Sequence, residues 1–246
     1  MKTTPSTPIT LPSSRYWAAA IAVWCCSAIA VWAWMTVYAG SADPIKKDVC
    51  STWPSDSLIH PASGKPTLVL FLHPRCPCSV ATIHELERVL TGSGIQSGQL
   101  PKVVVVASLP TDHSSQNPTN PKLAEWTNTN TIEAASKLRN AEIYWDIGGI
   151  EAERFKAKTS GSVLLYNAKG LQRFSGGVTI ARGHEGASVG GDYLRELLQD
   201  PSSTSIRSTP VFGCALVKSS SSLRPTSASP IVNELVAGLA NEGNEE

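Results

Sequence analysis

The feature that most constrains this chain is a long apolar stretch near its beginning. No charged residue occurs between Arg15 and Asp43, and residues 17–40 are apolar almost throughout. A helix rises about 1.5 Å per residue, so this stretch supplies the roughly 20 residues that a membrane-spanning helix needs. It exceeds the roughly 7–15 apolar residues usual in a cleaved signal peptide, which favours a retained transmembrane signal anchor over residues 16–40.

Two alternatives to a retained anchor stay open. Val37-Tyr38-Ala39 resembles the small-residue site at which a signal peptide is cleaved. An apolar helix can also be a buried core helix. Charge leaves the orientation of an anchor undecided, because Lys2 and Arg15 before the stretch are balanced by a Lys46-Lys47 pair after it. The long downstream chain, and cysteines suited to an oxidising compartment, favour a single-pass protein with an extracytoplasmic, periplasmic domain.

The charge balance excludes one class of function. The 246 residues include 21 Lys and Arg against 20 Asp and Glu, for a net charge of +1. A protein that tracks nucleic-acid phosphates needs a clustered excess of positive charge, and this sequence has none. We therefore expect no nucleic-acid partner.

Composition divides the chain into five parts. Ser, Thr and Pro enrichment predicts disorder, and clustered prolines predict a linker. We expect a disordered leader over residues 1–15, the anchor over 16–40, a linker over 41–64, a folded domain over 65–200 and a Ser-rich tail over 201–246.

The folded domain begins with a strand that runs into a helix. Residues 67–72 are a continuous run of apolar β-formers between two prolines, which predicts a buried strand. Residues 80–90 carry apolar side chains at helical spacing, and residues 101–108 form a second, Val-rich strand. Buried strands joined by a helix favour a parallel β-α-β unit.

The rest of the domain continues this alternation. We expect a helix over 123–138, a strand over 142–145, a helix over 150–157, a hairpin over 163–167 and 171–174, and a final helix over 193–198. The resulting order, β-α-β-α-β-α-β-β-α, predicts an α/β fold with a central mixed sheet and flanking helices.

Two cysteines lie where the first strand passes into the first helix of this domain. Cys76-Pro77-Cys78 places two thiols at a helix N-terminus, where free backbone N–H groups and the helix dipole stabilise a thiolate and lower its pKa. Cysteines separated by one residue can close a small, strained disulfide ring that is easily reduced. The pattern predicts a catalytic, redox-active pair with no cofactor.

Two other interpretations of these cysteines stay open. The pair can be small buried side chains in a redox-inert scaffold that binds another membrane protein. It can also be part of a copper carrier, because thiolates and imidazoles are soft ligands. The alternative metal set is Cys76, Cys78 and His184, with His73 and Cys214 as further candidates.

Two later segments can join the site. Residues 175–192 contain six glycines together with Arg182 and His184. They form either a flexible connector or a loop folded over the cysteines, in which Arg182 lowers a thiolate pKa and His184 moves protons. In the Ser-rich tail, a short apolar patch around Cys214 suggests docking near Cys76, where Cys214 would be a third redox thiol or a metal ligand.

Residues 67–198 resemble the thioredoxin superfamily. The resemblance is carried by the strand TLVLFL, the turn HPRCPCS, the strand VVVVAS and the hairpin VLLYN/LQRF. More narrowly, HPRCPCS, TSGSVLLYNAKG, RGHEG and TPVFGC are similar to a bacterial membrane-anchored thioredoxin-like group sometimes labelled RedB. The resemblance implies a thiol–disulfide oxidoreductase that acts on protein thiols or disulfides or on a membrane redox partner. It makes Cys76 the attacking thiol and Cys78 its resolving partner.

The sequence departs from the superfamily pattern at two places. One residue separates the cysteines where the usual motif has two, and Arg75 precedes them where the usual motif has Trp. Thr159-Ser160-Gly161 occupies the place of the cis-proline that normally faces the active site. The superfamily also contains peroxidases and copper chaperones, so the fold alone does not choose a chemistry.

Overall fold

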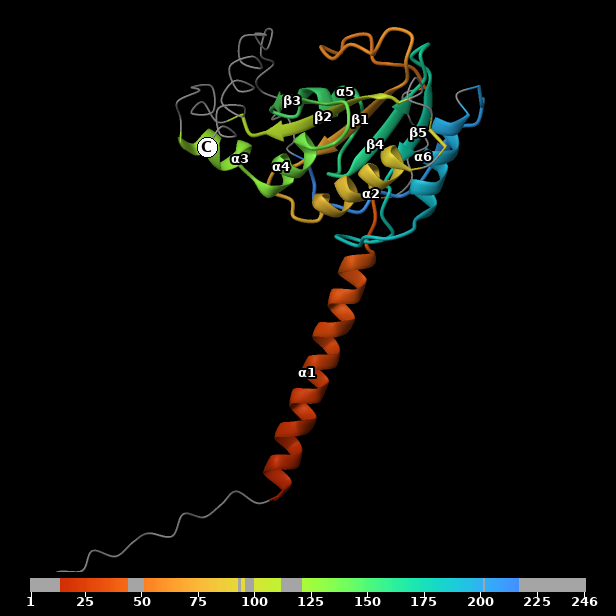
Figure 1. Cartoon of the computed structure of the whole chain (residues 1–246). Coiled ribbons are helices and arrows are strands. Elements are labelled where there is room, and N and C mark those ends of the chain that lie inside the picture. The colour runs from red at the N-terminus through yellow and green to blue at the C-terminus, as the bar shows by residue number, and fades with distance from the viewer. Residues whose placement is uncertain are drawn as a thin grey trace, which may run out of the picture. The chain divides into compact units, whose positions relative to one another are not determined.

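The computed structural model describes residues 14–43, 51–92, 94–95, 100–111, 121–200 and 202–216. They belong to two units, one within residues 1–40 and one within residues 41–246, which are described separately. The first unit contains α1 (Ser14–Gly40), a single helix of 27 residues (Figure 1).

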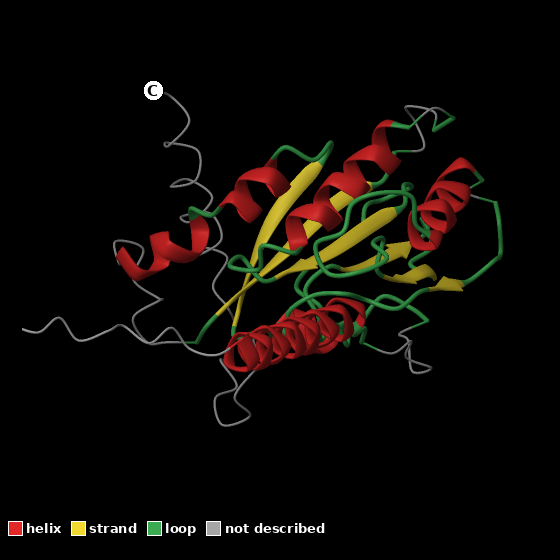
Figure 2. Ribbon diagram, turned by 90° about the horizontal axis from the view of Figure 1, so that it is seen from below, coloured by secondary structure: helices red, strands yellow, loops and turns green. Residues whose placement is uncertain are grey.

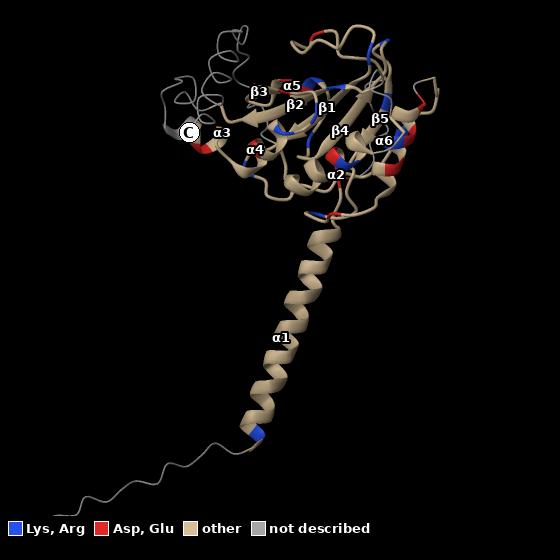
Figure 3. Cartoon of the chain, viewed as in Figure 1, with Lys and Arg blue, Asp and Glu red and all other residues tan. Residues whose placement is uncertain are grey.

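α1 is long and apolar enough to cross a membrane. At about 1.5 Å per residue its length is about 40 Å, which exceeds the thickness of a bilayer core. Its one charged residue is Arg15, at its start (Figure 3). A signal sequence near the N-terminus would pass the same test. The helix predicted over residues 16–40 is therefore present, whether it is an anchor or a signal sequence.

The second unit is built on a mixed sheet of six strands in the order β3-β2-β1-β4-β5-β6 (Figure 1). Its centre is β1 (Thr67–Leu72), which pairs in parallel with β2 (Lys102–Leu109) and antiparallel with β4 (Ser162–Tyr166). Every residue of β1 is buried, as expected for a strand covered on both faces. The outer strands are β3 (Ala141–Ile147), β5 (Gln172–Gly176) and β6 (Arg207–Ser208). This sheet confirms the predicted mixed α/β architecture.

Helices cover both faces of this sheet, and Figure 2 shows them lying along the strands. One face buries apolar side chains of α2 (Ser79–Thr91), α4 (Asn130–Ser136) and α6 (Val189–Gln199). The other face buries Ala152 of α5 (Ile150–Arg154) together with Phe155. The carboxyl end of β1, and the cysteine turn that follows it, therefore lie between two packed layers.

The prediction of a single helix over residues 123–138 is wrong. The structure has two helices there, α3 (Pro121–Thr127) and α4. Thr129 between them has an extended backbone conformation, and its hydroxyl accepts a hydrogen bond from the backbone N–H of Ile132 at 3.3 Å. A threonine in this position is a helix N-cap, which starts a new helix. The apolar spacing concealed this interruption.

Two predicted helix ends also differ. The helix predicted over residues 150–157 ends at Arg154, and Lys156 has a left-handed backbone with φ of 56° that no helix continues. The helix predicted over residues 193–198 begins earlier, at Val189. There the hydroxyl of Ser188 accepts a hydrogen bond from the N–H of Gly191 at 3.0 Å.

Packed residues extend beyond both predicted boundaries of the folded domain. Within the predicted linker, Trp53 packs edge-on against Tyr166, with 4.9 Å between ring centroids. Within the predicted tail, Val211 pairs with Asp43 as an isolated β-bridge, and Leu216 is buried. The apolar patch predicted around Cys214 thus packs on the domain, whereas the packing of Trp53 was not predicted. The predicted leader up to residue 13, Cys50 and the tail from residue 217 lie outside the described residues.

Candidate active site

The turn between β1 and α2 carries the two predicted cysteines. The backbone N–H of Cys76 donates to the carbonyl of His73 at 2.9 Å, and that of Ser79 donates to the carbonyl of Cys76 at 3.1 Å. Cys78 is the N-cap residue of α2. Both thiols therefore lie just before the first turn of the helix. The Cys76 side chain is completely buried, whereas that of Cys78 is half-buried.

A third thiol reaches this turn from the far end of the described chain. The Sγ atoms of Cys76 and Cys214 are 2.9 Å apart, although 138 residues separate them in the sequence. The structure thus places Cys214 beside Cys76, as the apolar patch around Cys214 predicted. At this distance the Cys76 thiol donates a hydrogen bond to the Cys214 sulfur, and Cys214 becomes the donor once Cys76 is ionised.

Ser160 connects the three parts of the site. Its Oγ accepts a hydrogen bond from the backbone N–H of His73 at 2.8 Å and lies 2.7 Å from the Oγ of Ser79. Its own N–H donates to the carbonyl of Cys214 at 2.8 Å. Ser160 stands where the superfamily pattern has its cis-proline, so one completely buried serine fixes the start of the turn, the start of α2 and the backbone of Cys214.

The three thiols differ in acidity. Burial acts to raise the pKa of Cys76, but hydrogen bonds from Cys214, Ser79 and backbone groups outweigh it and lower that pKa below its usual value. Burial raises the pKa of Cys214, and its hydrogen bond to Cys76 raises it further. Burial and the neighbouring Cys76 charge raise the pKa of Cys78. The first thiolate of the cluster therefore forms at Cys76.

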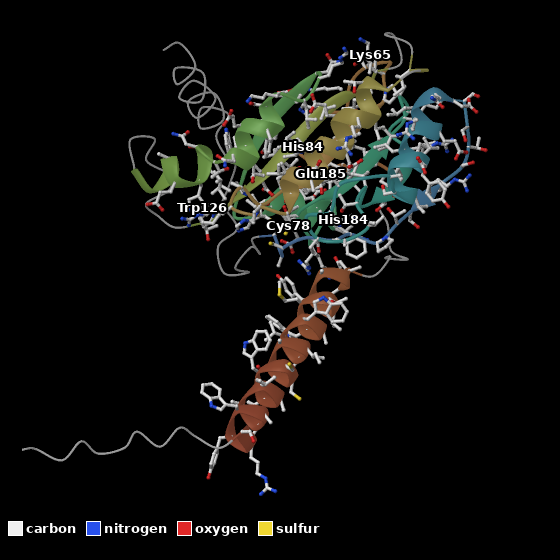
Figure 4. All side chains as sticks on the ribbon, turned by 60° about the horizontal axis from the view of Figure 1, so that its bottom comes forward. Lys65, Cys78, His84, Trp126, His184 and Glu185 are labelled. Carbon is white, nitrogen blue, oxygen red and sulfur yellow. The ribbon has the colours of Figure 1, made fainter. Side chains whose placement is uncertain are left out.

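The glycine-rich segment over residues 175–192 folds over the cysteines, as one of its two interpretations predicted. Arg182 donates a hydrogen bond to the carbonyl of Gly213, and its charge acts to lower the pKa of Cys78 and Cys214. A Cβ atom on Gly183 would lie 3.9 Å from the Sγ of Cys78, so the segment passes directly beside this thiol. A carboxylate oxygen of Glu185 lies 2.7 Å from Nδ1 of His84 on α2, which holds the segment down (Figure 4).

The two predicted histidines do not contact the sulfurs. His184 is exposed at the edge of the domain where Cys78 also lies (Figure 4), and its ring makes no hydrogen bond to any residue that the structure describes. Nδ1 of His73 accepts a hydrogen bond from the N–H of Arg75 at 3.2 Å, and the His73 ring packs against Trp126 at 5.3 Å between centroids. Burial lowers the pKa of His73. His73 therefore serves as a hydrogen-bonded structural histidine in this site.

The described residues contain no group of three His, Cys, Asp or Glu side chains placed to hold a metal ion. The three copper ligands proposed from the sequence therefore do not form such a group in the described part of the chain. Copper binding stays a prediction of the sequence pattern.

Two contributors to the site had no clear signal in the sequence. Trp126 packs against the cysteine turn, and the guanidinium of Arg75 lies 5.0 Å from its ring centroid. Ser79 supplies a hydroxyl to both Ser160 and the Cys76 sulfur.

Known structures resemble the second unit in fold. A hypothetical protein of Sinorhizobium meliloti is 18% identical, with a TM-score of 0.52 over 72% of this chain and 100% of that chain. A secreted Mycobacterium tuberculosis disulfide oxidoreductase is 16% identical, with a TM-score of 0.33 over 55% of this chain and 81% of that one. An exposed lipoprotein thioredoxin of Streptococcus pneumoniae is 14% identical, with a TM-score of 0.36 over 56% of this chain and 86% of that one.

The second unit has a mixed α/β fold, and this fold is similar to that of the Sinorhizobium meliloti protein. No protein-family model matches the chain, and no curated protein matches it either. These likenesses concern the fold alone. A function for this domain must therefore be argued from its own residues.

Proposed function

We propose that this chain is a thiol–disulfide oxidoreductase of the membrane-anchored, RedB-like kind. In this proposal α1 tethers the protein to a membrane and the thioredoxin-like domain lies on the extracytoplasmic side. Cys76 is the attacking thiol, and Cys78 is its resolving partner. The observation that carries the proposal is the position of Cys76 just before α2, with the Sγ of Cys214 2.9 Å from its own Sγ; the lowered pKa of Cys76 agrees with it.

The proposed exchange begins at Cys76. Its thiolate attacks one sulfur of a disulfide in a protein substrate, which forms a mixed disulfide and releases the first substrate thiolate. A second protein thiolate, from Cys78, then attacks the Cys76 sulfur and releases the other substrate thiolate. One disulfide is reduced to two thiols while two protein thiols become one disulfide, and the reverse sequence oxidises a dithiol.

The surroundings of Cys76 favour this role. A thiolate is the nucleophile in disulfide exchange, and hydrogen-bond donors stabilise it. The Sγ of Cys214 lies 2.9 Å from the Cys76 sulfur and can donate to its thiolate, and the Ser79 hydroxyl also acts to lower the pKa of Cys76. The positive charge of Arg182 nearby acts to lower the pKa of Cys78, which favours formation of the second nucleophile.

A turnover assay tests this function. The full chain, purified in detergent, is expected to catalyse the reduction of insulin disulfides by glutathione, and Cys76→Ser to abolish turnover. Cys25→Ser, which changes a thiol in α1, is the matched control and is expected to retain full activity. Turnover by Cys76→Ser equal to that of the unchanged chain would refute the proposal.

The membrane placement has its own test. A retained anchor predicts that the full-length chain stays in the membrane pellet after alkaline extraction, with residue 1 or 2 at its N-terminus. A soluble chain that begins near Gly40 would show that α1 is a cleaved signal sequence. A protease added to intact spheroplasts should digest the domain if it is extracytoplasmic.

A further inference from the structure

The segment of residues 207–216, which we call the crossing segment, is attached along its whole length. It begins as β6, which pairs in parallel with β5. It continues with a hydrogen bond from the N–H of Gly177 to the carbonyl of Pro210 at 3.2 Å. It ends with an antiparallel bridge between Thr159 and Ala215 and with an N–H···O bond from Leu216 to Lys158 at 2.9 Å.

Cys214 is therefore held on both sides. Its carbonyl accepts from Ser160, and the carbonyl of Gly213 before it accepts from Arg182. A Cβ atom on Gly213 would lie 1.9 Å from the carbonyl oxygen of Ser160, so glycine alone allows this close approach. A segment that docked only to cover apolar surface would not need such backbone contacts at the residue that carries the thiol.

These backbone contacts hold the sulfur of Cys214 beside that of Cys76. Cys76 has no exposed surface, and the Sγ of Cys214 lies 2.9 Å from its Sγ. The thiol of Cys78, in contrast, is half-buried beside Gly183. A disulfide between residues two apart closes a small ring, whereas a bridge from Cys76 to Cys214 joins segments that already touch and closes no small ring.

We propose that Cys214 is the internal disulfide partner of Cys76, so that the oxidised protein carries a Cys76–Cys214 disulfide. This inference rests on the proposed function and changes it at one point, because Cys214, in place of Cys78, carries out the second step of the same exchange. The Cys76 thiolate attacks a substrate disulfide and releases one thiolate. Cys214 loses its proton to solvent and attacks the Cys76 sulfur of the mixed disulfide, which releases the second substrate thiolate.

This assignment links the redox state to access. Because Cys76 is completely buried and its Sγ lies 2.9 Å from that of Cys214, an external disulfide reaches it only when the residues around it move. The Cys76–Cys214 disulfide then fastens the segment over the turn. Cys78, beside the glycine-rich loop, remains available to attack the Cys76 sulfur and release Cys214 again.

Peptide mapping tests the proposal. Cleavage by trypsin after Arg75, Arg88, Arg207 and Lys218 gives one peptide with both turn cysteines, residues 76–88, and one with Cys214, residues 208–218. The full chain in detergent is equilibrated with oxidised glutathione, alkylated and digested. We expect a disulfide-linked pair of these two peptides as the main product. The pair should persist in Cys78→Ser and disappear in Cys214→Ser.

The outcomes separate this inference from the proposed function. A disulfide confined to peptide 76–88, with Cys214 fully alkylated in the unchanged chain and in Cys78→Ser, overturns the assignment of Cys214. If insulin reduction still depends on Cys76 in that case, the proposed function stands without it. If the linked pair forms but the chain never reduces insulin, the pairing is supported and the oxidoreductase function is refuted. Cys25→Ser should leave both readouts unchanged.

Discussion

Replacement of Gly213 by alanine perturbs the site without changing a thiol. The added Cβ would lie 1.9 Å from the carbonyl oxygen of Ser160 and 3.0 Å from its carbonyl carbon. Both obstructing atoms are backbone, so no side-chain rotation relieves the clash. The crossing segment and the Ser160 backbone must separate by more than about 1 Å to restore ordinary van der Waals contact.

The size of the effect follows from this separation. The N–H···O bond from Ser160 to Cys214 measures 2.8 Å, and an increase of about 1 Å takes it beyond hydrogen-bond distance. Overpacking costs about 1–3 kcal/mol and the lost hydrogen bond about 0.5–1.5 kcal/mol. We expect Gly213→Ala to destabilise the domain by about 2–4 kcal/mol, which lowers Tm by roughly 4–16 °C for a domain of this size.

The same displacement changes the acidity of Cys76. The hydrogen bond from Cys214 helps to lower the pKa of Cys76, so its loss moves that pKa up. The assay is the pH profile of Cys76 alkylation, whose midpoint reports the pKa independently of how fast the reagent gains access. Gly213→Ala should shift the midpoint to higher pH in the full chain.

Gly92→Ala is the matched control. Its added Cβ would lie 3.1 Å from the nearest backbone oxygen, and its φ of −61° suits alanine. This variant should keep Tm and the alkylation midpoint close to those of the unchanged chain. Tm and midpoint values for Gly213→Ala that match those of Gly92→Ala would refute the close packing of the crossing segment on Ser160.

Three further predictions follow from single buried or charged groups. Ser160→Ala removes the acceptor of the His73 N–H, so the free energy of unfolding should fall by about 1–3 kcal/mol in urea denaturation; an unchanged midpoint contradicts this. Arg182→Gln removes a charge that lowers the pKa of Cys78, so the pH midpoint of Cys78 alkylation should rise; no shift would remove Arg182 from the site. Burial raises the pKa of Asp146 from 3.8 to about 6, so the folded state binds this proton more tightly than the unfolded state. The free energy of unfolding should therefore fall by up to about 3 kcal/mol from about pH 4 to about pH 7, and Asp146→Asn should lack this slope.

The sequence predicted those helices and strands that depend only on a local pattern of residues. The run of β-formers over residues 67–72 predicted β1 to the residue, because every side chain in it is buried and Pro66 and Pro74 flank it. The helix predicted over 123–138 failed because a single hydroxyl, that of Thr129, starts a new helix inside a continuous apolar pattern. A cap acts through one hydrogen bond, which periodicity does not register.

The site required contacts between distant segments. Cys76 and Cys78 were evident from their place at a strand-to-helix junction, whereas the position of Cys214 depends on backbone pairing of residues 207–216 with β5 and with Thr159. The side chain of His184 could not be placed from its neighbours in sequence. The adjacent Gly183 lies against Cys78, but His184 is exposed.

Because Cys76 and Cys214 are far apart in the sequence, the site is incomplete while the chain is being synthesised. Cys214 follows Cys76 by 138 positions, so at roughly 5–20 residues per second it leaves the ribosome roughly 7–28 s later. During that interval the turn cysteines are each other's nearest thiols, and no crossing segment covers them. An oxidant that acts on the growing chain therefore encounters a two-cysteine turn, whereas one that acts on the finished protein encounters a three-thiol site.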